Sequence, residues 1–215
     1  REDAVALAKS MVKTGNSLGM KVISQVTEMD NPIGTMFGNS HEIAECIECL
    51  KGNGPNDTME LVYAQGDALG YDIRPVIEDG SALDEFRKMC IRQGVDESDI
   101  DNMIQDPWSI LPRAQNRTEI VAKKSGFVSH VHALTIGEIL CKLGAGRTGE
   151  NPDIDHGVGA ELLVERGEYI QSGKPWIRFD TNVVLGSEMI DQIQLSLTTT
   201  ETEVEFSSRI LEIIQ

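Results

Sequence analysis

The stretch MDNPIGTMFGNSHEIAECIECLKGNGP, residues 29–55, joins a turn with proline and glycine to a helix that carries a CxxC motif. Asn39 or Ser40 can cap this helix, and Gly52 ends it. Side chains of apolar character recur at the spacing of one helical face, at Ile43, Cys46, Ile47 and Leu50. The segment is therefore either a redox or metal motif, or the hinge and helix of a larger fold.

On both sides of this segment the pattern alternates between helix and strand. Residues 2–14 repeat apolar side chains at helical spacing, and KVISQVTEM, residues 21–29, is typical of a short β-strand. Further helices are predicted over residues 57–70 and 81–94, each beginning at a capping side chain and ending at glycine. A helix that leads into a strand is one half of an α/β repeat, so we predict a largely helical α/β domain over residues 1–106.

The composition changes after the two prolines of PWSILPRA, residues 107–114. Short strands with alternating side chains are predicted downstream, in TEIVAKKSGFVSHV (118–131), GAELLVERGEYIQSGKPWIRFDT (159–181) and TTETEVEF (199–206). Between them, TIGEILCKLGAGR (135–147) predicts a helix that ends on a glycine-rich loop. We therefore expect a linker at 107–117 and a small C-terminal α+β domain at 118–215.

Length, composition and charge restrict the class of protein. The chain has 215 residues, of which 40% are hydrophobic, and can bury a sizeable core. Its formal net charge of −16 disfavours nucleic-acid or anionic-membrane binding, which needs clustered lysine and arginine. We expect a soluble cytoplasmic protein without a membrane span. Because the chain starts at Arg1 and not at methionine, we expect it to be part of a longer protein.

Cysteine and histidine patterns give weak signals for chemistry. The four cysteines are expected to be reduced. Cys46 and Cys49 lie within the predicted helix, without a second pair at zinc spacing, and Cys46 continues the apolar face, so packing is favoured over redox or metal chemistry. His130 and His132 alternate on one strand, where a solvated face is favoured over a metal site. We assign no histidine as catalytic.

The glycine-rich segment LGAGRTGENPDIDHG, residues 143–157, has two interpretations. Its backbone N–H groups and Arg147 could hold a phosphate, or it could be only a flexible connection. The acidic residues Glu150, Asp153 and Asp155 favour a closing flap over a fixed anion site.

Several spaced motifs resemble, in order, the thymidine and pyrimidine-nucleoside phosphorylase family. The first is AKSMVKTGNSLGMKVISQVTEMDNPIGTMFGNSHEIAECIECLKGNGP, and DGSALDEFRKM, LPRA, SGFVSHVHALTIGEILCKLGAGR and IDHGVGAELLVERGEYIQSGKPW follow it. LPRA and GVGAELLV look most similar to the animal thymidine phosphorylases. The likeness covers nearly the whole chain, although the connection at residues 66–72 is shorter than in relatives.

The resemblance implies a pentosyltransferase that converts thymidine and phosphate to thymine and 2-deoxyribose 1-phosphate. Members are homodimers whose subunits have a small helical domain and a large α/β domain, with the substrates in the cleft between them. They need no organic cofactor, and phosphate is a co-substrate. The family's catalytic and substrate-binding residues would precede Arg1, as would the helical domain. The chain would then be a C-terminal half, inactive without an N-terminal half.

Two sites are implied by the resemblance at matching positions. Some bacterial members bind a potassium-like ion through backbone carbonyls and a glutamate, which correspond here to Ile33, Met36 and Glu45. The alternative is that Glu45 is only a helix-dipole partner and a buried cap. The family's mobile loop corresponds to the segment with Gly144, Gly146 and Arg147. The opening stretch is then a hinge and helix, and its CxxC is incidental.

Two other functions stay open at this point. One is a non-catalytic binding or scaffold fragment, because no complete active site is present. The other is a related phosphoribosyltransferase, which shares the α/β architecture and a GN..E..E helix but lacks the region from SGFVSHV to SGKPW.

Overall fold

The computed structural model describes residues 1–147, 153–205 and 207–215. Their fold combines helices and strands, as the sequence predicts, and the longer helices lie mainly in the first half. The strand pairs within the described residues are antiparallel, which the sequence did not indicate. The helices are α1 (Glu2–Ser17), α2 (Asn39–Leu50), α3 (Asn56–Leu69), α4 (Arg74–Glu78), α5 (Ser81–Arg92), α6 (Glu97–Gln105), η1 (Pro107–Ser109), α7 (Ala133–Leu140), η2 (Cys141–Ala145) and α8 (Ser187–Leu195). The strands are β1 (Ser24–Thr27), β2 (Met36–Phe37), β3 (Asn116–Val121), β4 (Gly126–Val131), β5 (Gly159–Leu162), β6 (Tyr169–Ile170), β7 (Pro175–Thr181), β8 (Leu197–Thr200) and β9 (Ile210–Ile214).

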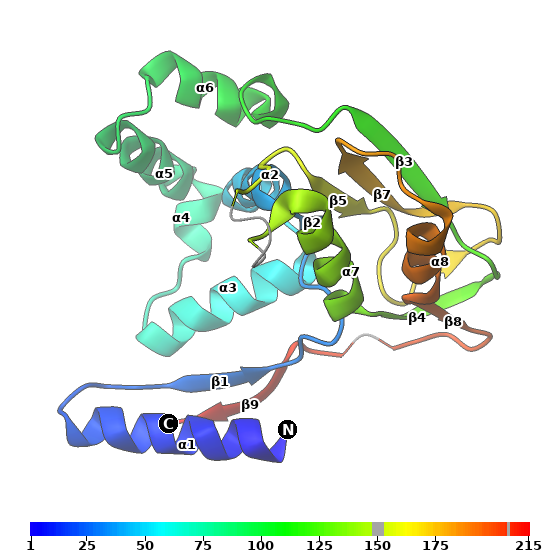
Figure 1. The fold of residues 1–215 in the computed structure, drawn as a ribbon. Helices are drawn as coiled ribbons and strands as arrows, with labels where there is room; N and C mark the ends of the chain where they lie inside the picture. The colour runs from blue at the N-terminus through cyan, green and yellow to red at the C-terminus, as the bar shows by residue number, and fades with distance from the viewer. Residues whose placement is uncertain (148–152, 206) are drawn as a thin grey trace.

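Strands from distant parts of the chain pair with one another. The described sheets have the orders β1-β9, β2-β5-β7-β3 and β6-β4-β8. Figure 1 shows α1 lying along the β1–β9 pair, with both termini close together at that end of the molecule. The strands β1 and β2 precede the predicted linker at 107–117, and they pair with β9 and β5, which follow it. Strand hydrogen bonds therefore join the segments before and after the linker.

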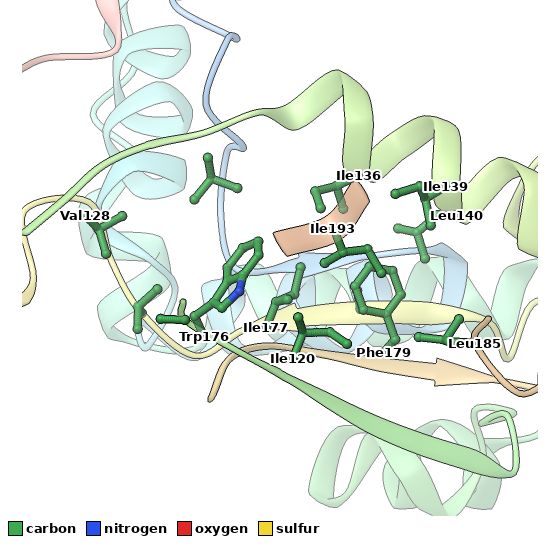
Figure 2. Close-up of a cluster of buried hydrophobic side chains, with 14 of the residues drawn as sticks. Ile120, Val128, Ile136, Ile139, Leu140, Trp176, Ile177, Phe179, Leu185 and Ile193 are labelled. Atoms are coloured by element: carbon green, nitrogen blue, oxygen red, sulfur yellow. The ribbon is translucent and has the colours of Figure 1, made fainter. Parts of the chain in front are cut away.

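The central strand β7 has one face in the core and one face that carries charged side chains. Successive side chains of a strand point to opposite faces, so Ile177 and Phe179 face one way and Arg178 and Asp180 the other. Figure 2 shows the first face packed against buried residues of α7 and α8, namely Ile136, Ile139, Leu140 and Ile193. Burial of these large side chains stabilises the sheet and fixes the direction of Asp180.

A second, smaller core attaches α2 to the helices that follow it. Ile47 of α2 is fully buried against Ile100 and Met103 of α6. The α2 helix therefore packs on α6 with one face and leaves its first turn directed at the sheet.

One predicted strand is wrong over most of its length. Residues 199–206 were expected to be extended, but β8 ends at Thr200 and residues 201–205 are not in a strand. Thr200 pairs with Phe127 near the start of the partner strand β4, and the ladder between β4 and β8 ends there. Thr200 Oγ1 instead donates to the carbonyl of Thr202 at 2.8 Å and closes a turn.

None of the helices in the described part of the chain has the length and apolar character needed to cross a bilayer.

Candidate functional site

The turn before α2, residues 29–38, is called the hinge turn. A concave cavity of about 720 Å³ lies between this turn, α2 and the end of α7. The turn and the start of α2 supply one side, and Cys141, Ala145 and Gly146 supply the other. Residues predicted separately from the motif at 29–55 and from the glycine-rich loop are thus brought to one place.

The hinge turn is organised by Glu45. Its Oε1 accepts hydrogen bonds from the backbone nitrogen and the hydroxyl of Thr35, both at 2.7 Å, and from the backbone nitrogen of Met36 at 3.2 Å. Gly34 has φ +74°, and a Cβ there would lie 2.2 Å from Glu45 Oε2. Glycine is therefore required both for the left-handed backbone and for the close approach of the carboxylate.

The carboxylate of Glu45 is in an environment that disfavours its charge. Burial, with a contribution from the negative charge of Asp57, raises the pKa of Glu45 despite the hydrogen bonds from Thr35 and Met36. Thr58 Oγ1 is also buried here and has no hydrogen-bond partner among the described residues. A cation beside Glu45 would offset the cost of the buried charge, and this donor set of carboxylate and hydroxyl oxygens suits a hard cation.

The residues that the resemblance nominated for an ion lie together. Ile33, Met36 and Glu45 all line the cavity, and so does Thr58. The bonds from Glu45 to Thr35 and Met36 also give this side chain the alternative structural role of holding the turn. Within the described ranges there is no cluster of three or more histidine, cysteine, aspartate or glutamate side chains that could hold a metal.

The cysteine side chains of the CxxC motif do not lie in the helix face where the sequence predicted them to pack. Cys46 is exposed and lies outside the buried face formed by Ala44 and Ile47, so its predicted place in the apolar stripe is wrong. Both Cys46 and Cys49 line the cavity. Partial desolvation of the thiol groups at the cavity wall, with a contribution from the charge of Glu45, raises the pKa of both thiols, and that of Cys49 to about 11, so they are protonated at neutral pH. Protonated thiols are poor nucleophiles and poor metal ligands.

His130 and His132 lie close together, with ring centroids 5.8 Å apart. His132 follows the end of β4 and caps α7, because its Nδ1 accepts from the backbone nitrogen of Thr135 at 3.3 Å. The second histidine therefore has a structural role that strand alternation did not indicate.

A cluster of polar and charged side chains around the buried carboxylate of Asp180, near the start of α2, was not predicted. His41 Nε2 lies 3.0 Å from Asp180 Oδ2, and Arg113 and Arg117 donate to the same carboxylate at 2.6 and 3.1 Å. Burial alone would raise the pKa of Asp180, but the hydrogen bonds from His41 and Arg113 and the arginine charges lower it to about 2. Trp108 contacts the ring of His41 edge-on and lies under the guanidinium of Arg113.

A backbone hydrogen bond joins the two described ends of the predicted flap. Gly144 is buried with φ +109°, and its carbonyl accepts from the backbone nitrogen of Asp155 at 2.8 Å. Gly146 packs against Cys141, whereas the Arg147 side chain is exposed and does not line the cavity. Glu150 lies outside the described residues.

A second unpredicted cluster fixes the other end of the hinge turn. Arg209, beside β9, is buried and donates to Glu28, to Asp57 and to the carbonyl of Pro32. Its local sequence gives no signal for this role, since arginine is usually exposed.

Sequence comparison shows to which proteins these elements are similar. Residues 127–179 match the pyrimidine nucleoside phosphorylase C-terminal domain. This segment includes α7, β5 and most of β4 and β7, so it contains much of the C-terminal core and one side of the cavity.

Similarity to curated proteins extends over most of the chain. It is 36% identical to human thymidine phosphorylase over 195 residues, which are 83% of this chain and 40% of the relative. It is 34% identical to Bacillus subtilis pyrimidine-nucleoside phosphorylase over 205 residues, 89% of this chain and 45% of the relative. The chain is thus related to the thymidine and pyrimidine-nucleoside phosphorylases, which confirms the resemblance seen in the motifs, and it spans less than half the length of these proteins.

Proposed function

We propose that this chain is the C-terminal part of a phosphorylase that cleaves thymidine, or a related pyrimidine nucleoside, with phosphate. The observation that carries the proposal is the similarity to such enzymes over 83% to 89% of the chain. In the reaction, a phosphate oxygen forms a bond to C1′ of the sugar while the C1′–N1 bond breaks. The base leaves with the bonding electrons and takes up a proton, which gives thymine and 2-deoxyribose 1-phosphate.

The chain contributes one wall of the substrate cleft and not its anion-binding groups. The 720 Å³ cavity is lined by the carboxylates of Glu42 and Glu45, and its described lining contains no lysine or arginine. A phosphate dianion would be repelled by such a wall unless positive groups were supplied from elsewhere. We therefore assign catalytic and phosphate-binding residues to an N-terminal half, and expect this chain to be inactive alone.

The same proposal includes the quaternary structure and the ion. The complete subunit would have an α/β domain that includes residues 1–106, joined by 107–117 to a C-terminal domain at 118–215, and would form a homodimer. A potassium-like ion would be held by the carbonyls of Ile33 and Met36 and by Glu45. The raised pKa of Glu45 and the buried Thr58 hydroxyl support this assignment.

The two alternative functions make different predictions. The match of residues 127–179 to a phosphorylase domain favours phosphorolysis over phosphoribosyl transfer. A scaffold fragment would bind a partner other than an N-terminal half and would have no nucleoside chemistry in any complex.

Thymine release tests the proposal. The chain is assayed with thymidine, with and without inorganic phosphate, first alone and then together with a separately expressed N-terminal half of a phosphorylase. We expect phosphate-dependent thymine release only when both halves are present. Activity of this chain alone, or no activity in the stable complex, would contradict the proposal.

A further inference from the structure

We propose that His41 is a positioning residue that locks the first turn of α2 to β7, and through this turn holds the base of the glycine-rich loop at the cavity. The inference rests on the proposed function only in taking the cavity as the substrate site. The contacts themselves do not depend on it.

The first turn of α2 bonds to both ends of the loop. Asn39 Nδ2 donates to the carbonyl of Ala145 at 3.0 Å, and the backbone nitrogen of Ser40 donates to the carbonyl of His156 at 3.3 Å. Between these contacts, the Asp155 nitrogen bonds the Gly144 carbonyl at 2.8 Å. A shift of this turn would therefore move the loop base, including Ala145, which lines the cavity.

His41 ties that turn to the sheet through one ring nitrogen. Its side chain is 1% exposed, and Nε2 lies 3.0 Å from Asp180 Oδ2 on the polar face of β7. Because the Asp180 carboxylate only accepts hydrogen bonds, Nε2 must carry the proton. Nδ1 has no hydrogen-bond partner among the described residues and faces Gly159, where a Cβ would lie 2.1 Å from it.

Two close neighbours pack against the ring of His41. Trp108 contacts the His41 ring with centroids 4.9 Å apart, and Gly159 lies against Nδ1. Only glycine at 159 permits this approach. The geometry thus needs one donor at the Nε2 position, and a buried bond to an ionised acceptor is among the stronger hydrogen bonds in proteins.

Loss of His41 should act locally. Asp180 keeps its bonds from Arg113 and Arg117 when the imidazole is removed, so the buried carboxylate is still paired and the sheet can still fold. What is lost is the connection between the first turn of α2 and β7.

The test is amide hydrogen exchange in matched variants of the whole chain. In His41→Leu we expect the amides of Ser40 and Asp155 to exchange at least about tenfold faster, because each depends on the position of the α2 turn. Glutamine places its amide nitrogen near the position of Nε2, so His41→Gln should keep wild-type exchange at both amides. Amides of the β1–β9 pair should not change, and His130→Leu, a histidine replacement outside the cluster, should leave both reporters unchanged.

Three results would overturn the inference. They are unchanged exchange at Ser40 and Asp155 in His41→Leu, equal acceleration in His41→Gln, and acceleration that is uniform over the chain. A measurement on the wild-type protein covers the case in which His41→Leu does not fold. Nitrogen-15 NMR of the imidazole should show a proton on Nε2, and a neutral ring that carries its proton on Nδ1 alone would contradict the proposed bond. Neither readout needs enzymatic activity, so failure here is distinct from failure of the proposed function.

Discussion

Arg209 and Asp57 are joined across 152 positions of sequence by two hydrogen bonds, from Nε at 3.2 Å and from Nη2 at 2.8 Å. Asp57 in turn accepts from the backbone nitrogen of Gly34 at 3.3 Å. The start of β9 is thereby connected through α3 to the hinge turn beside the cavity. The same guanidinium also reaches Glu28, so one buried cation compensates two carboxylates.

We predict that Arg209→Ala strongly destabilises the fold. Removal of the guanidinium leaves Glu28 and Asp57 without their buried partner, which should lower the free energy of unfolding by about 3–5 kcal/mol. Urea unfolding measures the change. The control is Arg92→Ala, whose ion pair with Glu85 is exposed and should contribute at most about 1 kcal/mol. Equal losses in the two variants would show that the Arg209 cluster has no special role.

Gly34→Ala should distort the hinge turn. The new Cβ would meet Glu45 Oε2 at 2.2 Å in a backbone of φ +74°, and we expect a loss of roughly 2–3 kcal/mol in unfolding free energy. Gly19→Ala is a matched control, because Gly19 has φ +81° but nothing within 4 Å of its Cβ position. It should lose only about 1 kcal/mol, from backbone strain. If Gly34→Ala loses no more unfolding free energy than Gly19→Ala, the contact of the new Cβ with Glu45 does not destabilise the turn.

The ion proposal predicts stabilisation by potassium that depends on Glu45. Because burial raises the pKa of Glu45, its contribution favours folding below the unfolded value of 4.5 and is lost as pH rises through the folded pKa. A bound cation should recover this loss, so KCl should raise the Tm at neutral pH by about 2–4 °C over choline chloride of equal ionic strength. The effect should be absent in Glu45→Gln and in acid. The same increase in Glu45→Gln would rule out this carboxylate as a ligand.

Asp180 should make the free energy of unfolding depend on pH in the acid range. Its pKa is lowered to about 2 from 3.8, so its contribution is present above pH 3.8 and is lost as pH falls toward 2. Relative to Asp180→Asn, the wild-type protein should lose about 2 kcal/mol of unfolding free energy over that window. Urea unfolding at a series of pH values gives the difference. A difference that stays constant from pH 5 to pH 2 would mean that the cluster does not lower the pKa.

Local patterns in the sequence predicted α1, α2, α3, α5, α7 and several strands, because amphipathic spacing and glycine stops are properties of neighbouring residues. They gave no prediction of α4, α6 or α8. The α2 helix is an example, since it was expected after the Pro32–Gly34 turn and is found at Asn39–Leu50. The clusters around Asp180 and Arg209 were missed for a physical reason. His41 and Asp180 are 139 positions apart, and no periodicity within either segment records which distant side chain it will meet.

The resemblance to a family supplied what the local patterns could not. It placed Ile33, Met36 and Glu45 in one site, and the structure brings them to one cavity wall. Their role as ion ligands stays a prediction, as does the division into domains at 107–117. The exposed position of Cys46 was not foreseen because the apolar spacing of α2 fits two neighbouring faces, and packing on α6 selects the one with Ile47.

The measurement that tests the central proposal most directly is phosphorus-31 NMR of the reaction of thymidine with inorganic phosphate. The sample contains this chain in complex with a phosphorylase N-terminal half. We predict that the resonance of a sugar 1-phosphate appears as inorganic phosphate declines, in equal amount to the thymine released, and that it does not appear with this chain alone. Release of thymine without sugar phosphate, or no reaction in the intact complex, would contradict the assignment of this chain to a nucleoside phosphorylase.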